Sequence, residues 1–291
     1  KVSPPVSVAA AYYPKIDRAS FAILTELDRR ADVRMRESSE KIKRTTLTNV
    51  TSRDRIDALT GLSFEDEFLS RAEALARMRR EDGTFVSPAE FVPVLEKTQL
   101  IELLDKHIWR ALFAWQRERM LSGKQLVPVS LNVSRIDLLS FDVPDYLDTL
   151  IAHYGVPASC IRAEITETAC TLQMDDVRSL IDALDELGIE VYMDDFGSGQ
   201  SSLNMLRGVD VDAIKLDRAF LSSDKETAGK GESIIQSVME LSRTLDIPVI
   251  VEGIETEGQV EMMRRLGAEY AQGFYFYRPM SPDAFAALVD E

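Results

Sequence analysis

Acidic and amide side chains recur at one kind of position in this chain, at or just after the carboxyl end of a short apolar run. A single Asp or Glu in such a place is usually a helix cap or a solvated loop residue. The same placement after five successive runs is improbable as a capping accident. The residues concerned are Asn132, Glu164, Glu167, Asp194, Asp195, Lys215, Asp217, Glu252, Glu255 and Gln272.

If these runs are neighbouring parallel strands, the side chains meet at one edge of a sheet, where they can bind a ligand. Carboxylates that lie close together repel one another unless cations neutralise them. The chain has only two histidines and two cysteines, so the available ligands are oxygens, which select hard ions such as Mg²⁺ or Mn²⁺. The sequence therefore predicts a divalent-metal site at this edge.

The adjacent pair Asp194 and Asp195 opens the sequence D-D-F-G-S-G-Q-S-S-L, whose glycines suit a loop that approaches a phosphate. Neighbouring carboxylates that hold two ions about 3.5–4 Å apart serve in-line displacement at phosphorus. Lys215 has two interpretations of similar weight from the residues alone. It orients an attacking water or neutralises a phosphate, or it forms a structural ion pair with a carboxylate.

Short β-rich runs alternate with helical segments from about residue 69 onward, which is typical of a parallel sheet covered by helices. Gly188 and Gly267 follow the last apolar residue of two helices, as helix-terminating glycines do. Seven strands are one short of a (β/α)₈ barrel, and the missing strand could come from the residues before Leu69. A doubly wound open sheet is the competing architecture. The predicted strands are 72–78, 126–132, 161–166, 190–194, 213–217, 248–252 and 269–274, and the predicted helices are 146–154, 177–187, 233–245 and 258–266.

The composition excludes several classes of protein. The chain has 291 residues, 45% of them apolar, which is enough to bury a core. The chain has a net charge of −15, so it lacks the positively charged surface that binding to DNA or RNA polymers needs. No apolar run approaches the ~20 residues that span a bilayer, and residues 1–11 do not form a signal peptide. We expect a cytoplasmic chain, or the cytoplasmic portion of a longer, membrane-anchored protein.

The chain resembles the EAL-domain cyclic di-GMP phosphodiesterases through eight ordered motifs. Glu73, Ala74 and Leu75 form the naming tripeptide, and Arg77 completes its E-x-L-x-R form. The other motifs are S-P-A-E-F (87–91), L-N-V-S (131–134), E-I-T-E-T (164–168), D-D-F-G-S-G (194–199), I-K-L-D (214–217), V-E-G-I-E-T (251–256) and A-Q-G-F (271–274). The resemblance implies a modified (β/α)₈ TIM-type barrel whose first strand is irregular and antiparallel.

The resemblance also implies a function and a set of roles. The function is hydrolysis of cyclic di-GMP to linear pGpG with two Mg²⁺ or Mn²⁺ ions per site, commonly in a homodimer. A non-hydrolysing cyclic di-GMP receptor is the alternative, and a barrel enzyme of carbohydrate or enolate chemistry is remote. The implied metal ligands are Glu73, Asn132, Glu164, Asp194, Asp195 and Glu252. The implied catalytic residues are Lys215 and Glu252, which position water, and Glu167, which holds the glycine loop. The implied substrate-binding residues are Leu75, Arg77, Asp217, Glu255 and Gln272.

The first part of the chain departs from the family. We divide the chain into an N-terminal helical linker segment, residues 1–62, and an EAL domain, residues 63–291. The strand bearing Q-P that normally shortly precedes E-A-L is absent there, although Y-Y-P-K-I-D (12–17) resembles a fragment of it. The sequence D-A-L-T-G-L (57–62) resembles the opening of a GGDEF diguanylate cyclase domain, whose remainder is missing. We expect no cyclase activity, and the segment could connect to a sensor or GGDEF domain. Gln200 replaces the aromatic residue usual after the loop's second glycine.

Overall fold

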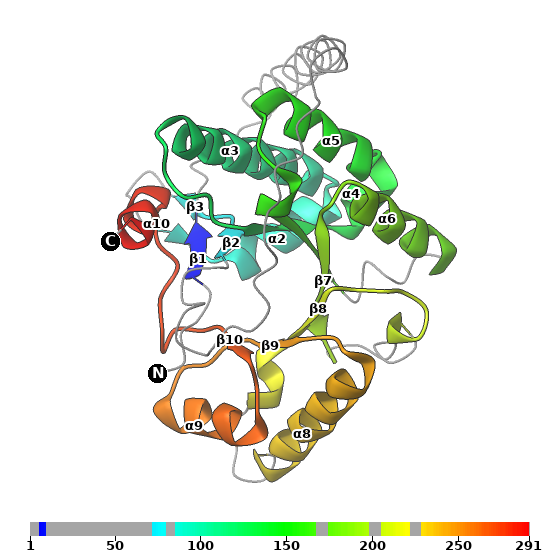
Figure 1. The fold of residues 1–291 in the computed structure, drawn as a ribbon, viewed down its shortest axis with the longest axis vertical. Coiled ribbons are helices and arrows are strands. Elements are labelled where there is room, and N and C mark those ends of the chain that lie inside the picture. Colours follow the sequence, from blue (N-terminus) through cyan, green and yellow to red (C-terminus); the bar gives the residue numbers. More distant parts are fainter. Residues whose placement is uncertain are drawn as a thin grey trace.

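A parallel β-sheet forms the centre of the molecule in the computed structural model, which describes residues 6–9, 72–79, 85–166, 174–197, 205–221 and 228–290. Neighbouring strands follow one another in chain order, and every ladder between them is parallel (Figure 1). The strands are β1 (Val6–Ala9), β2 (Ala72–Leu75), β5 (Val129–Val133), β6 (Ile161–Thr166), β7 (Glu190–Phe196), β8 (Ala213–Leu216), β9 (Val249–Val251) and β10 (Tyr270–Ala271). The α/β barrel-type fold predicted from the sequence is therefore confirmed.

The eighth strand comes from before Leu69, as the sequence allowed, but its direction corrects the prediction. Strand β1 pairs with β2 in parallel, with Val6 opposite Ala72 and Ala9 opposite Leu75. An antiparallel pair can be joined by a tight hairpin, whereas a parallel pair needs a crossover of a dozen or more residues. Residues 10–71 separate the two strands and supply that length.

All seven predicted strands are present, and the one at 161–166 has the predicted bounds. The predicted strand 72–78 is too long, because β2 ends at Leu75. The next residues form β3 (Met78–Arg79), which pairs with β4 (Phe85–Val86) in a separate antiparallel hairpin. The strand of the sheet thus stops where the chain turns into this hairpin.

Helices cover the outside of the sheet, and the four predicted ones are present. Gly188 and Gly267 have φ values of 79° and 75°, so they end helices in the left-handed region as predicted. The helices are α2 (Pro88–Lys97), α3 (Ile101–Leu121), α4 (Arg135–Ser140), α5 (Val143–Tyr154), α6 (Met174–Glu186), α8 (Ala228–Leu245), α9 (Glu257–Leu266) and α10 (Pro282–Val289), with short 3₁₀ turns η1 (Ala158–Cys160) and η3 (Arg218–Leu221). No helix in these described ranges is long and apolar enough to cross a membrane.

The long helix α3 was not predicted, although it is the longest helix described. Its buried face carries Leu104 and Ile108 at helical spacing, but Asp105, Lys106 and Arg119 are buried on it as well. The buried apolar residues of α3 nevertheless recur at helical spacing, namely Ile101, Leu104, Ile108, Trp109, Leu112 and Phe113. The apolar periodicity therefore does indicate this helix, and the prediction omitted it.

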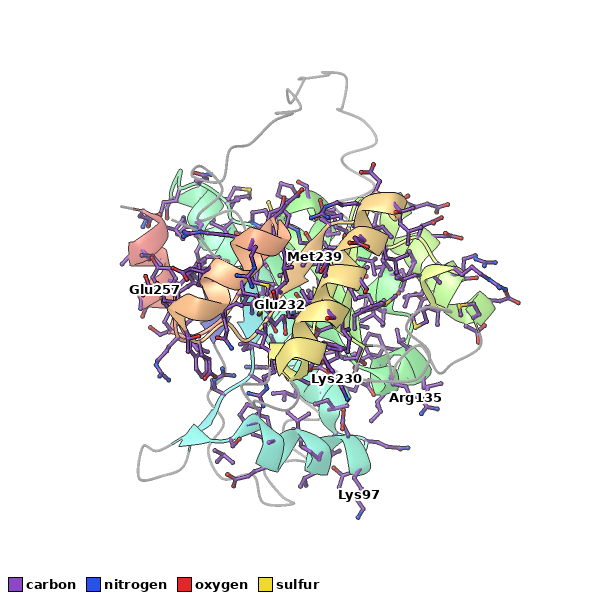
Figure 2. All side chains as sticks on the ribbon, turned by 90° about the horizontal axis from the view of Figure 1, so that it is seen from below. Lys97, Arg135, Lys230, Glu232, Met239 and Glu257 are labelled. Carbon is purple, nitrogen blue, oxygen red and sulfur yellow. The ribbon has the colours of Figure 1, made fainter. Side chains whose placement is uncertain are left out.

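The helices also show which edge of the sheet is open to ligands. A helix that follows a parallel strand starts near that strand's carboxyl end. In Figure 2 the amino end of α8, marked by Lys230, points toward the side of the molecule where α2 and Lys97 lie. Helix α2 and the end of β5 also line one cavity. Helix α2 thus lies at the carboxyl edge of the sheet, where barrel active sites are built.

Trp109 ties helix α3 to the end of strand β5. Its side chain is 1% exposed, and its Nε1 donates a hydrogen bond of 3.1 Å to the backbone carbonyl of Asn132. The indole also packs against Phe141 and Tyr146, with ring centroids 5.9 and 6.0 Å away. The buried Trp109 side chain thus holds the backbone at Asn132, a predicted metal ligand.

We expect Trp109→Phe to lower the free energy of unfolding by about 1–3 kcal/mol, because the substitution leaves a buried carbonyl without its donor. Trp115→Phe is the matched control, since Trp115 is only partly buried. Urea denaturation of both variants measures the difference. Equal losses in the two variants would show that the hydrogen bond to Asn132 contributes nothing specific.

Candidate active site

The amino group of Lys215 on β8 is the centre of a cluster of four carboxylates. Its Nζ lies 2.6 Å from Glu164 and 2.7 Å from Glu252, and 3.4 Å from Asp194 and 3.5 Å from Glu73. The Lys215 side chain is 2% exposed. The four acids come from β2, β6, β7 and the end of β9, so Glu164, Asp194 and Glu252 of the predicted set meet at Lys215.

The cluster shows how strongly the sheet is curled. Strands β2 and β8 are four strand spacings apart in the sheet order, which would be about 19 Å in a flat sheet. Lys215 nevertheless reaches Glu73 on β2. Gln272, directly after β10, donates from Nε2 to Glu73 Oε2 at 2.8 Å. Residues from opposite ends of the sheet order therefore share one mouth, as in a barrel rather than an open sheet.

A β-bulge gives Asp194 and Asp195 their positions. Met193 pairs with Ile214 and Phe196 with Leu216, so two residues of β7 oppose the single residue between their partners on β8. Asp195 adopts a φ of 55°, and its backbone N–H donates to Asp194 Oδ1 at 2.9 Å. Successive side chains on a regular strand point to opposite faces. The bulge breaks that alternation, as bulges beside active sites do.

The pKa values follow from crowding and burial. Burial alone would lower the pKa of Lys215, but the four surrounding carboxylates raise it well above its usual range. Burial raises the pKa of Glu164 well above its usual range, although Lys215 opposes this. Lys215 is therefore a fixed positive charge, and it acts as the counterion of the cluster. The structure supports the ion-pair interpretation of Lys215 in the protein alone.

Two further acids have raised pKa values near neutrality. Burial, opposed by Lys215 and reinforced by Asp194, raises the pKa of Glu252 to about 7. Burial together with the charges of Asp194 and Asp217 raises the pKa of Asp195 to about 6. One lysine does not balance this many acids, so the site favours additional cations or bound protons.

The residue types in the mouth fit divalent metal ions. Six oxygen-bearing side chains are available there, namely Glu73, Asn132, Glu164, Asp194, Asp195 and Glu252. Glu252 Oε1 is buried, and the Lys215 ammonium 2.7 Å away is its counterion. Within the described ranges no three Asp, Glu, His or Cys side chains already surround a metal-sized point. The acids turn toward Lys215 instead.

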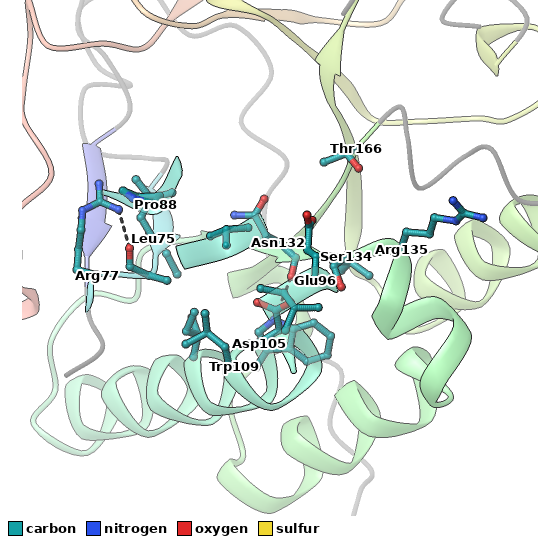
Figure 3. A pocket seen from close by; sticks show the side chains of 17 residues that line it. Leu75, Arg77, Pro88, Glu96, Asp105, Trp109, Asn132, Ser134, Arg135 and Thr166 are labelled. Carbon is teal, nitrogen blue, oxygen red and sulfur yellow. Dashed lines mark hydrogen bonds between the residues drawn. The ribbon is translucent and has the colours of Figure 1, made fainter. Parts of the chain in front are cut away.

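A cavity of about 280 Å³ adjoins the cluster on the side of helices α2 and α3 (Figure 3). Leu75 and Arg77 from the end of β2 line it on one side, and Asn132 on another. Arg77 donates to the carbonyl of Ala76 at 2.8 Å, and burial lowers the pKa of its guanidinium. The predicted substrate residues Leu75 and Arg77 thus line the same cavity as the predicted metal ligand Asn132.

The other predicted residues are placed less uniformly. Asp217 Oδ1 accepts from the backbone N–H of Ala219 at 2.5 Å, so it caps the turn η3 while it neighbours Asp195. Glu255 is exposed, and no interaction among the described residues joins its carboxylate to the cluster. Glu167 lies outside the described residues, as do Gln200, the 57–62 motif and all of the predicted N-terminal helical segment except residues 6–9, which form strand β1 and not a helix.

Supporting residues around the cavity were missed from the sequence. Ser134 and Asp137 form a capping box at the start of α4, with Ser134 N donating to Asp137 Oδ2 at 2.7 Å. The S-x-x-D spacing directly after Asn132 could have revealed it. Asp105 also lines the cavity, and burial together with Asp137 raises its pKa well above the usual range. No sequence signal indicates that Asp105 is buried.

We expect Lys215→Met to lower the free energy of unfolding at neutral pH by about 3–5 kcal/mol, because it leaves buried carboxylates without their counterion. The loss should shrink as the pH falls and those acids bind protons. The control is Lys124→Met, which removes an exposed lysine 2.6 Å from Asp290 and should cost about 0–1 kcal/mol. Chemical denaturation between pH 5 and 8 tests this, and a loss no larger than the control's contradicts it.

We expect Glu252→Gln to stabilise the metal-free protein, or leave it unchanged, at pH 8. A carboxyl whose folded pKa is about 7 takes up protons on folding. Its contribution to stability therefore falls as the pH rises from the pKa of the unfolded chain to the pKa of the folded protein, and is lost above it. The gain of the variant should therefore vanish near pH 4. Thermal melts in a chelator at both pH values measure it. A variant that is less stable than the parent at pH 8 would show that Glu252 mainly stabilises Lys215.

Comparisons with known proteins agree with this geometry. The sequence profile of the EAL domain matches residues 63–279. Two similar proteins are the "Probable cyclic di-GMP phosphodiesterase PdeB" of Escherichia coli K12, 33% identical over 76% of this chain and 41% of its own length, and the "Cyclic di-GMP phosphodiesterase PA2567" of Pseudomonas aeruginosa, 30% identical over 94% of this chain and 44% of its own length. The chain thus spans less than half the length of either relative.

A solved structure has the same fold. The structure titled "PaMucR Phosphodiesterase, c-di-GMP complex" superposes with a TM-score of 0.65 and 27% identity, covering 74% of this chain and 91% of that one. The profile match covers most of the chain and includes every residue of the carboxylate cluster. The chain belongs to the EAL domain family.

Proposed function

We propose that this chain hydrolyses cyclic di-GMP to linear pGpG in bacterial second-messenger signalling. The observation that carries the proposal is the cluster of four carboxylates around Lys215, gathered from β2, β6, β7 and β9 at the open edge of the sheet. Relatives that carry the same domain are named cyclic di-GMP phosphodiesterases. A similar solved structure is titled as a complex with c-di-GMP.

The ligands that would hold two Mg²⁺ or Mn²⁺ ions are Glu73, Asn132, Glu164, Asp194, Asp195 and Glu252. Such ions, when bound, lower the pKa of water and stabilise charge on phosphate oxygens. The bulge in β7 brings two of these would-be ligands, Asp194 and Asp195, next to each other near the mouth. The excess of acids over the single lysine makes cation binding electrostatically favourable.

Lys215 and Glu252 would position the attacking water. Water adds to one phosphorus, and the bond from that phosphorus to the ribose 3′ oxygen breaks. The freed 3′ oxygen takes up a proton. The product is one open dinucleotide with a terminal 5′ phosphate and a free 3′ hydroxyl. Arg77 and Leu75 would contact the ligand in the cavity, and Gln272, Asp217 and Glu255 would do so at the opposite rim. Glu167 would hold the glycine loop.

Two further parts of the proposal concern assembly. A homodimer is our expected state for the EAL domain. Residues 1–62, of which residues 6–9 form strand β1 of the sheet, would connect it to a sensor or GGDEF domain, since relatives of this chain are much longer than the part it matches. The rival function is a cyclic di-GMP receptor without turnover. Each position predicted to bind metal carries an oxygen-bearing side chain. This favours the enzyme over the receptor.

We expect the purified chain to convert cyclic di-GMP to pGpG with Mg²⁺ or Mn²⁺, and Asp194→Ala to abolish the conversion while the fold stays intact. Chromatography of the nucleotides measures turnover, and a chelator should stop it. Asp142→Ala is the control, because Asp142 caps helix α5 and should affect stability by only ~1 kcal/mol. Tight binding without turnover would instead support the receptor, and full activity of Asp194→Ala would refute the two-metal assignment.

A further inference from the structure

Two buried aspartates meet close to the carboxyl end of strand β5. Asp105 on α3 is 7% exposed and Asp137 in the first turn of α4 is 0% exposed. Their carboxyl groups are in hydrogen-bond contact, and Asp105 also lines the cavity shown in Figure 3. Two buried carboxylates in contact repel each other strongly, so the pair needs either a cation or a proton.

No cation of the described residues neutralises this pair. Lys106, the nearest lysine in the sequence, pairs instead with Glu102 at 2.7 Å. Arg135 lines the same cavity but is exposed. The other charged side chains that face the two aspartates are both acids, Glu96 on α2 and Glu102 on α3. In the part of the chain that the structure describes, no three such side chains surround a metal-sized point. A proton therefore has to be shared.

The hydrogen-bond partners show which aspartate carries the proton. Asp137 Oδ2 accepts from the backbone N–H and from the hydroxyl of Ser134, each at 2.7 Å, and such bonds favour the ionised form of a carboxyl. Asp137 Oδ1 is buried and accepts from no N–H or O–H group of the described residues. A hydrogen on Asp105 is the donor that this oxygen lacks. In agreement, burial and the charge of Asp137 raise the pKa of Asp105 well above its usual range.

Two contacts one helical turn apart join helix α3 to the chain around Asn132. Trp109 Nε1 donates to the carbonyl of Asn132 at 3.1 Å. Asp105 lies four residues earlier, on the same face of the helix, and contacts Asp137. The Asp137 carboxylate in turn holds the N–H of Ser134, two residues after Asn132. The backbone at the end of β5 is thus held at Asn132 itself and directly beyond it.

We propose that Asp105 is a positioning residue that carries a proton at neutral pH, donates it in a hydrogen bond to Asp137, and thereby holds Asn132 in place for metal binding. This inference rests on the proposed function, in which Asn132 is a metal ligand, and it adds a residue to that site. The proton stays on Asp105 and takes no part in the reaction. Loss of a supporting contact of this kind lowers metal affinity or activity roughly 10- to 100-fold.

Asp105→Asn is the informative variant, because a carboxamide donates the same hydrogen bond without a titratable proton. We expect it to keep the parent's turnover of cyclic di-GMP and its Mn²⁺ requirement. Asp105→Ala removes the donor and leaves the Asp137 carboxylate unpaired, so the Mn²⁺ concentration for half-maximal turnover should rise roughly 10- to 100-fold. Asp182→Asn and Asp182→Ala are the matched controls, since Asp182 is exposed on α6, and they should change neither quantity.

Two measurements without turnover test the shared proton itself. In protein labelled with ¹³C at the aspartate carboxyls, one signal should stay in the protonated position between pH 5 and 8, and it should be missing from Asp105→Asn only. A carboxyl whose pKa rises on folding contributes less to stability as the pH rises. The urea midpoint of Asp105→Asn relative to that of the parent should therefore increase from pH 5 to pH 8, whereas that of Asp182→Asn should not.

The outcomes separate this inference from the proposed function. If the parent hydrolyses cyclic di-GMP but Asp105→Asn needs as much Mn²⁺ as Asp105→Ala, or Asp105→Ala needs no more than the parent, the positioning role is refuted and the function stands. Absence of a protonated signal from residue 105 also refutes it. If the parent shows no turnover, the proposed function fails. Mn²⁺ affinity measured by calorimetry then replaces turnover, and equal affinities of the parent and Asp105→Ala refute the positioning role. Thermal melts check that each variant is folded.

Discussion

The interaction on which this structure depends is the burial of the Lys215 ammonium among four carboxylates. Nζ lies within 2.6 to 3.5 Å of all of them. Burying any of these charges alone would cost several kcal/mol, so each is tolerated only because the others are present. The lysine is a counterion that the fold cannot lose, and the surplus of acids leaves the mouth ready for further cations. Stability and proposed chemistry therefore rest on the same atoms.

The surrounding architecture places these charges within reach of one another. A curled sheet brings Glu73 from β2 to Lys215 on β8, and the bulge in β7 presents two successive aspartates near the mouth. Trp109 holds the carbonyl of Asn132 from behind. The rim is fixed in the same way, because Gly273 lets the chain after Gln272 pack directly on Ile254. Catalytic groups need such supporting contacts, because a small displacement of a catalytic group lowers the reaction rate strongly.

The structure also assigns several residues contacts within the protein that the sequence did not indicate. Lys215 in the protein alone is the ion-pair partner of the acids, and Asp217 caps a turn as well as neighbouring Asp195. The two interpretations of each residue are compatible, because a group that makes an ion pair or a cap within the protein can also contact a bound ligand. Asp105, by contrast, is a buried acid that lines the cavity with no role assigned from the sequence.

The sequence by itself determined the alternating order of strands and helices, the family, and which side chains lie at the strand ends. These features are local or repeat along the chain, so periodicity, terminal glycines and motif spacing reveal them. Only the tertiary structure decided the parallel direction of β1, the bulge at Asp195 and the burial of the ionisable residues Asp105 and Lys106 on helix α3. Each of these depends on contacts between residues far apart in the chain. The convergence of four strands on Lys215 is of the same kind, because it follows from the curl of the whole sheet and from no single segment.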